Sequence, residues 1–83
     1  MTDYNVQIKV MLLKDLLDPQ GKAVQGSMHS LGLDTVRDVR VGRHITLSIQ
    51  ADSEASARNA AEEACKKLLA NPVMEYYEIE MIQ

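Results

Sequence analysis

The residues that follow the N-terminus alternate between apolar and polar, and this alternation constrains the fold more than any other feature. The apolar members are Tyr4, Val6, Ile8, Val10 and Leu12. Side chains two residues apart lie on the same face of a strand, so this period predicts a β-strand with one buried face. The same period recurs at residues 45–51 and 77–81. The chain therefore contains at least three strands that each need a cover over one face.

The segments between these strands carry helix-capping signals. Asp18-Pro19 predicts a helix start, because Asp caps free amide groups and proline is tolerated at the first helical position. Gly32 is expected to end this helix in the left-handed conformation. Ser53 predicts the cap of a second helix that runs to about Leu69. On a 100° wheel, one face of the second helix carries mostly small side chains, at Ala57, Ala60, Ala61, Ala64 and Leu68.

A further strand is predicted between the first helix and residue 45, from the apolar residues Val36, Val39 and Val41. Residues opposite one another in a sheet point to the same face, so Val41 should face Ile45 and Val39 should face Leu47. This register predicts a hairpin with an odd loop, Gly42-Arg43-His44. It also predicts a β-bulge near Arg37-Asp38, which would bring Val36 into phase.

The predicted element order is βαββαβ. A chain of 83 residues has room for one core only, so residues 1–83 are read as a single domain. This order most often forms a ferredoxin-like α+β fold, with two layers in which two helices lie on an antiparallel sheet. The fold hosts many unrelated functions and selects none of them.

Few residues in the chain are suited to catalysis. Cys65 lies at the edge of an apolar helix face, where a free cysteine behaves as a small hydrophobic residue. Ser27, His29 and Ser30 lack the glycines of a nucleophile elbow, and residues two apart on a helix do not face each other. The two histidines and one cysteine lack the spacing of metal ligands. We therefore predict no catalytic residue, no cofactor site and no metal site in this chain.

The charge and hydropathy of the chain exclude other classes of partner. The formal net charge is −3 and the pI about 5.2, which gives no basic surface for nucleic acid or an anionic membrane. No stretch approaches the roughly 20 apolar residues of a membrane span, and the N-terminus lacks the pattern of a signal peptide. We expect a cytoplasmic protein that binds neither nucleic acid nor membrane.

The end of the first predicted strand carries more large apolar side chains than one face of a sheet can bury. They are Met11, Leu13, Leu16 and Leu17. Either the following loop folds over them or a partner chain does, since exposed apolar patches mark interaction sites. These four residues are our candidate oligomer interface, in a homodimer or a homotetramer.

Three runs of residues resemble motifs of one known family, PurS, the small S subunit of phosphoribosylformylglycinamidine synthase. The run Leu17-Asp18-Pro19-Gln20-Gly21, with Val24 and Leu31-Gly32, resembles the first-helix signature of that family. A second run, Asp38-Val39-Arg40-Val41-Gly42-Arg43, is similar to its second-strand motif. Residues 65–77, which include Asn71-Pro72, resemble the end of its second helix and its final strand.

The resemblance implies a non-catalytic subunit of a glutamine-dependent carbon–nitrogen ligase. A glutaminase subunit releases ammonia, and a synthetase subunit uses ATP and that ammonia to convert formylglycinamide ribonucleotide to formylglycinamidine ribonucleotide in purine biosynthesis. The S subunit bridges the two and assists ammonia transfer. ATP and magnesium are expected on the synthetase partner and no cofactor on this chain. The candidate partner interface is Asp18, Pro19, Gln20, Gly21, Arg40, Gly42, Arg43, Asn71 and Pro72.

Two other classes of function use the same topology or chain length. One is an ACT-like regulatory module that binds a small metabolite at a dimer interface. The other is a small stand-alone enzyme, which the sequence favours least because no cluster of titratable residues can be identified.

Overall fold

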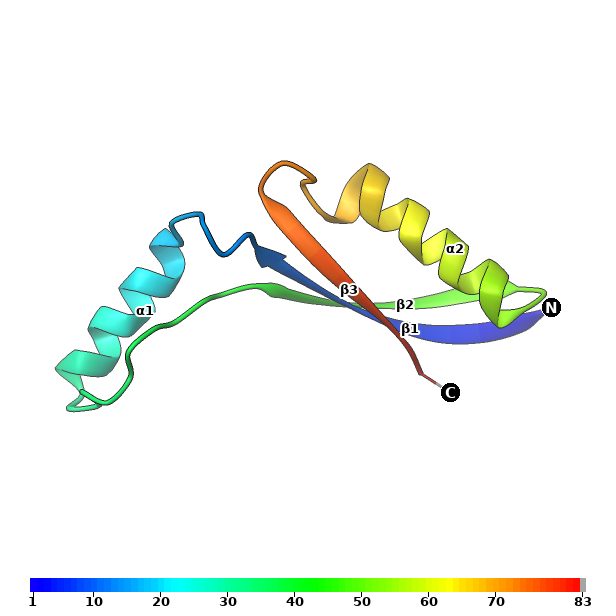
Figure 1. Cartoon of the computed structure of the whole chain (residues 1–83). Helices are drawn as coiled ribbons and strands as arrows, with labels where there is room; N and C mark the ends of the chain where they lie inside the picture. The colour runs from blue at the N-terminus through cyan, green and yellow to red at the C-terminus, as the bar shows by residue number, and fades with distance from the viewer. Residues whose placement is uncertain (83) are drawn as a thin grey trace.

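The structure, a computed structural model, describes residues 1–82. Five main elements follow in the order β1 (Thr2–Leu12), α1 (Pro19–Ser30), β2 (Arg43–Ala51), α2 (Glu54–Ala64) and β3 (Glu75–Ile82), with a short π-helix, η1 (Cys65–Leu69), directly after α2. The three strands form an antiparallel sheet in the order β2-β1-β3, and α2 lies along one of its faces (Figure 1). The predicted α+β class, with helices and an antiparallel sheet, is confirmed.

The core lies between the central strand β1 and the small face of α2. Val6, Ile8 and Val10 on β1 are at most 1% exposed, and Ala61 and Cys65 on the helix are fully buried. An α-helix is about 10 Å wide and strands are about 4.8 Å apart, so one helix covers the central strand and only the inner part of its neighbours. The apolar residues of the edge strands are accordingly only partly buried, at Ile45, Leu47, Ile49, Tyr77, Ile79 and Met81.

The predicted helix caps are present. The side chain of Asp18 accepts a hydrogen bond from the N–H of Gly21, and that of Ser53 accepts one from the N–H of Ser56. Gly32 has φ +84°, and the N–H of Leu33 donates to the carbonyl of Met28 in the bond pattern of a Schellman cap. The polar and glycine residues at these positions therefore set the helix boundaries as the sequence indicates.

The end of the second helix differs from the prediction. The N–H of Ala70 donates to the carbonyl of Cys65, five residues back, so the last turn is a π-turn with one extra residue. The extra residue changes which side chains face the sheet. Leu68, predicted on the buried face, is 82% exposed, and Leu69 is partly buried against the core instead.

The fourth predicted strand is also absent within residues 1–82. Residues 36–42 are extended but pair with no strand, so the predicted hairpin over residues 42–44 and the bulge at Arg37-Asp38 are wrong. The cause lies in the contacts of Arg40 and Val41 with the loop between β1 and α1. These contacts hold residues 36–42 in line with β2 rather than folded back along it (Figure 1).

Helix α1 consequently lies beyond the end of the sheet rather than over it (Figure 1). The molecule measures 52 × 26 × 14 Å, with a radius of gyration of 16.4 Å. A compact domain of this length would have a radius of gyration of about 12 Å. The chain is therefore much more elongated than a closed βαββαβ domain.

Gly21 is required by the close approach of residues 36–42 to α1. A Cβ at this position would overlap the carbonyl oxygen of Val39, which is main chain and cannot rotate away. At Gly26, in the same helix, a Cβ would meet nothing within 4 Å. Gly21 therefore permits a main-chain contact that a Cβ would block, whereas the position of Gly26 has room for a Cβ.

We expect Gly21→Ala to lower the free energy of unfolding by about 1–3 kcal/mol, the usual cost of overpacking a closed contact. Gly26→Ala should raise it by about 0.5–1 kcal/mol, because alanine is the better helix former. Thermal and urea unfolding of the two variants measures both changes. A Gly21→Ala variant as stable as Gly26→Ala would show that residues 36–42 do not approach α1 this closely.

Candidate functional site

A hollow of about 200 Å³ lies where the start of α1, the end of β1 and the starts of β2 and β3 meet. It is lined by Val10, Leu12, Asp18, Gln20, Val41, Gly42, Arg43 and Glu75. Four of these residues, Asp18, Gln20, Gly42 and Arg43, belong to the partner interface predicted from the sequence. The fold thus brings together motifs that are more than 20 residues apart in the chain.

Asp18 stands at the centre of this site and is only 4% exposed. Its Oδ1 accepts the N–H of Gly21 at 2.9 Å, and its Oδ2 accepts the N–H of Val41 at 2.7 Å. These hydrogen bonds, that from Val41 first, hold the pKa of the carboxyl below its ordinary value. The carboxylate therefore caps α1 and, with its second oxygen, fastens the chain that leads into β2.

Arg40 makes a second connection between the same two segments. Its Nη1 donates to the carbonyl of Leu16 and its Nη2 to the carbonyl of Leu13, both at 2.9 Å. The planar guanidinium suits this use because its donors are held in a fixed fork. The loop from residue 13 to 18 is thus tied to residues 40–41 by one carboxylate and one guanidinium.

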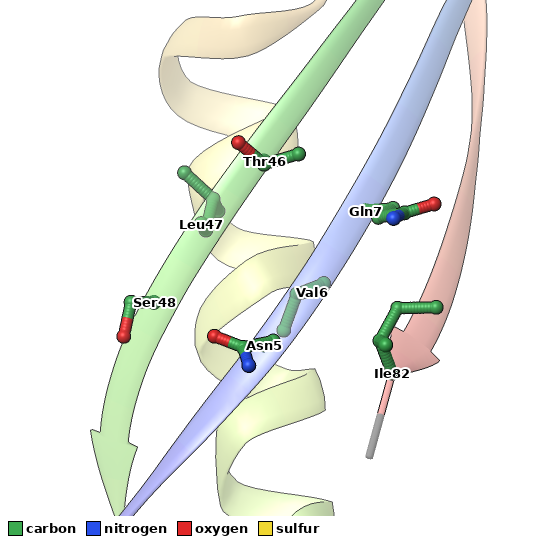
Figure 2. Close-up of a pocket in the computed structure, with 7 residues that line it drawn as sticks. All are labelled: Asn5, Val6, Gln7, Thr46, Leu47, Ser48 and Ile82. Carbon is green, nitrogen blue, oxygen red and sulfur yellow. The ribbon is translucent and has the colours of Figure 1, made fainter.

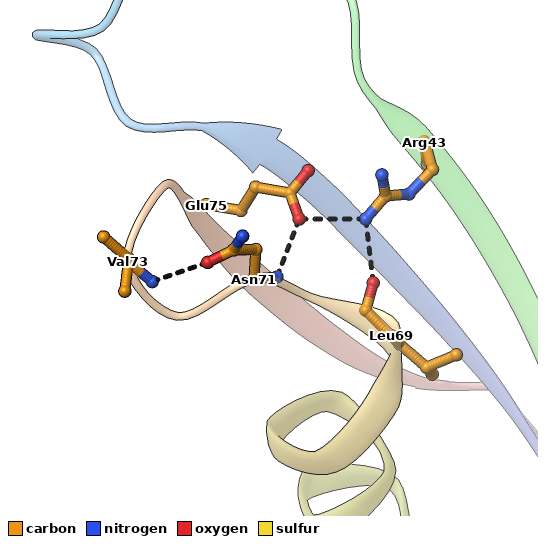
Figure 3. Close-up of polar contacts among 5 residues, drawn as sticks. All are labelled: Arg43, Leu69, Asn71, Val73 and Glu75. Carbon is orange, nitrogen blue, oxygen red and sulfur yellow. Dashed lines mark hydrogen bonds and ion pairs between the residues drawn. The ribbon is translucent and has the colours of Figure 1, made fainter.

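A second polar cluster lies on the other side of the hollow (Figure 3). Oε1 of Glu75 accepts from the main-chain N–H of Asn71 at 2.8 Å and lies 3.0 Å from Nη2 of Arg43. The same Nη2 donates to the carbonyl of Leu69 at 2.8 Å. The bond from Asn71, followed by the contact with Arg43, lowers the pKa of Glu75. This cluster fastens the Asn71-Pro72 turn to the start of β2.

The chemistry of the site is structural rather than catalytic. Both carboxyl groups have lowered pKa values, so both are ionised at neutral pH and accept main-chain N–H bonds. A general acid or base works best with a pKa near the operating pH, and neither group meets that condition. Elsewhere, burial raises the pKa of the Cys65 thiol, with a smaller contribution from Glu62, which disfavours the reactive thiolate form.

The residues predicted for the interface divide into buried supports and exposed groups. Asp18 and Gly21 are buried, and Arg40 is half-buried. Gly42 is exposed at its own surface, but a Cβ there would overlap Sδ of Met11. The side chains open to a partner are those of Pro19, Gln20, Arg43, Asn71 and Pro72.

The four predicted oligomer residues are also divided. Leu17 is 70% exposed, and Leu13 is exposed at the other end of the same loop. Met11 and Leu16 are half-buried. Met11 and Leu16 are therefore partly covered within this chain, whereas the side chains of Leu13 and Leu17 stay exposed.

Sequence reasoning missed Glu75 and two exposed apolar residues near it, Val73 and Met74. The main-chain N–H of Leu13 donates to the carbonyl of Met74, so Val73 and Met74 lie next to Leu13, at the start of the loop from residue 13 to 18. The signal for Glu75 was present: a carboxylate four residues after an asparagine that ends a helix can accept that residue's free N–H. The turn geometry that brings Arg43 to the same oxygen was not visible in the sequence.

The other face of the sheet carries a shallower hollow of about 420 Å³ (Figure 2). Asn5, Gln7, Thr46 and Ser48 line it with uncharged amides and hydroxyls, and its apolar lining residues are Val6, Leu47 and Ile82. In Figure 2 helix α2 lies behind the strands, so these polar groups are on the face away from the core. The amides and hydroxyls of this hollow are not acid–base groups, and the charged residues of the same face, Lys9, Glu78 and Glu80, lie farther along the strands.

Within residues 1–82, no three His, Cys, Asp or Glu side chains lie close enough together to hold a metal ion. None of the helices in this part of the chain is both long enough and apolar enough to cross a membrane.

Comparison with known proteins gives one consistent result. Residues 5–83 match the family model of PurS, described as phosphoribosylformylglycinamidine (FGAM) synthase. The chain belongs to the PurS family. Its resemblance to that family, argued above from three short motifs, is therefore confirmed along nearly the whole chain.

Individual PurS proteins show the same extent of similarity. The chain is 42% identical over 78 residues to the PurS subunit of phosphoribosylformylglycinamidine synthase from Bacillus subtilis, which covers 94% of this chain and 92% of that one. It is 35% identical to the PurS subunit of Methanocaldococcus jannaschii, with 94% of each chain covered. A chain in the structure of PurLQS from Thermotoga maritima is 28% identical, covers 99% of this chain and 100% of its own, and superposes with a TM-score of 0.92.

We expect Asp18→Asn to lower the Tm at pH 7 by about 4–8 °C, as the loss of one buried hydrogen bond does in a domain of this size. The amide has one acceptor oxygen, so either Gly21 or Val41 loses its acceptor. The carboxyl pKa is lowered from 3.8, so its contribution is complete above about that pH and is lost as the pH falls through the folded value. The Tm difference from the natural chain should therefore shrink below about pH 4.

Asp38→Asn is the matched control, because Asp38 is exposed and its side chain has no hydrogen bond within residues 1–82. Its Tm should stay within about 2 °C of the natural value at every pH, as is usual for surface substitutions. Equal effects of the two substitutions would contradict the role assigned to Asp18.

Proposed function

We propose that this chain is the non-catalytic bridging subunit of a phosphoribosylformylglycinamidine synthase complex. It joins a glutaminase subunit to a synthetase subunit that converts formylglycinamide ribonucleotide to formylglycinamidine ribonucleotide with ATP, and it assists the transfer of ammonia between them. The observation that carries this proposal is the family match over residues 5–83. The match to a chain of the PurLQS structure supports a place within such an assembly.

The geometry of the hollow supports a role in binding protein rather than in chemistry. Its two carboxylates, its one arginine, Arg43, and the neighbouring Arg40 are occupied by contacts that fix main-chain segments. Around it stand groups suited to a protein interface: Leu17, Gln20, Pro72 and Val73 are all exposed. A rigid support with an exposed rim of mixed apolar and polar groups is typical of the surface a protein partner covers.

The same proposal assigns the cofactors and the compartment. ATP and its magnesium belong to the synthetase subunit, and this chain contributes no ligand to them. The complex acts in the cytoplasm. The chain also forms a homodimer or homotetramer, since an elongated molecule with uncovered Leu13 and Leu17 gains by burying them against another copy.

We expect omission of this chain to abolish product formation from glutamine while the synthetase keeps substantial activity with a high concentration of ammonium salt. Glutamine-driven synthesis needs ammonia to pass between two active sites, whereas added ammonium reaches the synthetase directly. The measurement is product formation by the two partner enzymes with and without this chain, once with glutamine and once with ammonium.

The opposite result has a clear reading. If ammonium-driven turnover also vanished without this chain, while the synthetase stayed folded, the chain would contribute to the ATP-dependent step itself. A bridging role alone would then be insufficient.

We also expect Gln20→Arg to weaken assembly without unfolding the domain. Gln20 is exposed, lines the hollow and lies in the first turn of α1, so the longer charged side chain obstructs a partner seated there. Assembly is measured by co-elution with the two partner enzymes in gel filtration. The apparent affinity should fall by about 10-fold or more, as for a charge introduced at the centre of an interface.

Asn59→Arg is the control for this experiment. Asn59 is exposed on the outer side of α2, so the same charge is added to a helix away from the hollow. Both variants should keep the circular dichroism spectrum of the natural chain. If Asn59→Arg disrupted assembly and Gln20→Arg did not, the interface would have to be moved to the outer side of α2.

A further inference from the structure

Exposed apolar side chains are concentrated on the connection between α2 and β3. Within residues 1–82, eight large apolar side chains are exposed, and three of them fall in residues 68–74. Leu68 is 82% exposed, Val73 78% and Met74 46%. Pro72, beside them, is exposed as well. We name these four residues the apolar tip.

Hydrogen bonds fix the main chain that carries the apolar tip (Figure 3). The N–H of Val73 donates to Oδ1 of Asn71 at 3.0 Å, and the N–H of Asn71 donates to Oε1 of Glu75 at 2.8 Å. The carbonyl of Met74 accepts from the N–H of Leu13 at 2.9 Å, which ties the end of the connection to the end of β1. The shape of the tip is therefore set before any partner binds, and a partner does not have to order it.

The π-turn brings Leu68 to this surface. A regular helix would turn Leu68 toward the sheet, but the extra residue puts Leu69 in that place and leaves Leu68 outside. Nη2 of Arg43 donates to the carbonyl of Leu69 at 2.8 Å and so supports the turn. Such turns occur frequently at functional sites. The outward position of Leu68 thus follows from the winding of the main chain.

The charge around the apolar tip differs from that of the rest of the molecule. Residues 64–74 contain two lysines and no acidic residue, whereas the whole chain has a net charge of −3. Lys67 is paired with Glu63, but Lys66 is exposed and has no ion pair within residues 1–82. Glu75, the next acidic residue, is paired with Arg43. The tip therefore complements a surface with acidic groups at its edge.

We propose that the apolar tip docks into an apolar pocket with acidic residues at its rim on one enzyme subunit of the complex. Exposed apolar side chains on a rigid turn fill such a pocket as the anchors at the centre of an interface. Lys66 pairs with the rim and favours encounter with the acidic surface. This inference rests on the proposed function and specifies one contact through which the bridge is made.

Two other occupants fit the charge less well. If two copies met tip to tip in a symmetric contact, their Lys66 side chains would face each other and repel. An anionic membrane attracts clusters of about four to eight basic residues, whereas this connection has two lysines, of which Lys67 is already paired. An acidic pocket on a protein agrees with both the small apolar area and the single available charge.

Substitution of Leu68 tests the apolar contact. Because Leu68 is 82% exposed, Leu68→Ser leaves the stability of the domain nearly unchanged. The chain is titrated by calorimetry into an equimolar mixture of the synthetase and glutaminase subunits, and then into each subunit alone to find which one holds the pocket. We expect the affinity for the mixture to fall about 10-fold. Leu31→Ser is the matched control, since Leu31 is 77% exposed beyond α1, and it should leave the affinity within about 2-fold.

Substitution of Lys66 tests the charge of the pocket. The affinity of the natural chain should fall as sodium chloride rises from about 50 to about 300 mM, because salt screens the pairing of Lys66 with the rim. Lys66→Glu should bind at least 5-fold more weakly at low salt and should lose this dependence. Arg58→Glu is the control, because Arg58 is exposed about 12 Å away along the same helix and should keep the natural salt dependence.

The possible results separate this inference from the proposed function. Equal affinities of the natural chain and Leu68→Ser overturn the docking site and leave the bridging role standing, whereas a natural chain that does not bind the mixture overturns both. A smaller oligomer of Leu68→Ser in sedimentation would assign the tip to a contact between copies. Flotation with vesicles of phosphatidylcholine and about 30% phosphatidylserine, lost in Leu68→Ser, would assign it to a membrane. Either assignment contradicts the proposal.

Discussion

The carboxylate of Asp18 is the interaction on which the arrangement of this molecule depends. One oxygen caps α1 and the other holds the N–H of Val41, so a single buried side chain decides where the helix begins and where the chain that leaves it must run. Arg40 closes the same junction from the other side through the carbonyls of Leu13 and Leu16. Together with the bond from Gln25 to the carbonyl of Arg37, these contacts keep residues 36–42 out of a closed hairpin. The Asp-Pro start of α1 and the Arg-Val-Gly segment are thus two halves of one structural unit.

The remainder of the molecule is a small core with a single cover. Val6, Ile8 and Val10 are buried beneath the alanines of α2, while the edge strands keep apolar side chains that are only half-buried. A core of this width stabilises one central strand well and leaves both edges with little support. Partly covered edge strands are in agreement with the membership of this chain in a family of enzyme subunits.

The sequence was sufficient for features that local chemistry controls. The period of two at residues 4–12 gave β1 and its buried face, and Asp18, Gly32 and Ser53 gave the helix boundaries. Features set by contacts distant in sequence were not predictable. The hairpin was inferred from strand parity alone, and parity is the same whether the matching strand belongs to one chain or to another. Leu68 was misplaced because a helical wheel assumes a uniform period, which the π-turn interrupts.

The candidate site shows the same division. The motifs named its residues, and the fold brought Asp18, Gln20, Gly42 and Arg43 to one hollow. Their roles could not be read from the motifs, because Gly21 and Gly42 are required by overlaps inside this chain rather than by any partner. The residues of a short motif in this chain are therefore required in part by the packing of its own fold and do not by themselves mark a partner contact.

The π-turn at residues 65–69 shows how this chain accommodates an inserted residue within a helix. It holds one residue more than a regular turn needs, and the surplus is accommodated by a wider loop of main chain rather than by a break in the helix. Removing one residue before Leu68 would restore regular winding and place Leu69 at the position that a regular helix buries, so Leu69 would stay inward and Leu68 outward. A change of length by a single residue within this turn is therefore absorbed by the winding, and the side chains on either side of it, Ala57, Ala61 and Leu69, keep their places against the sheet.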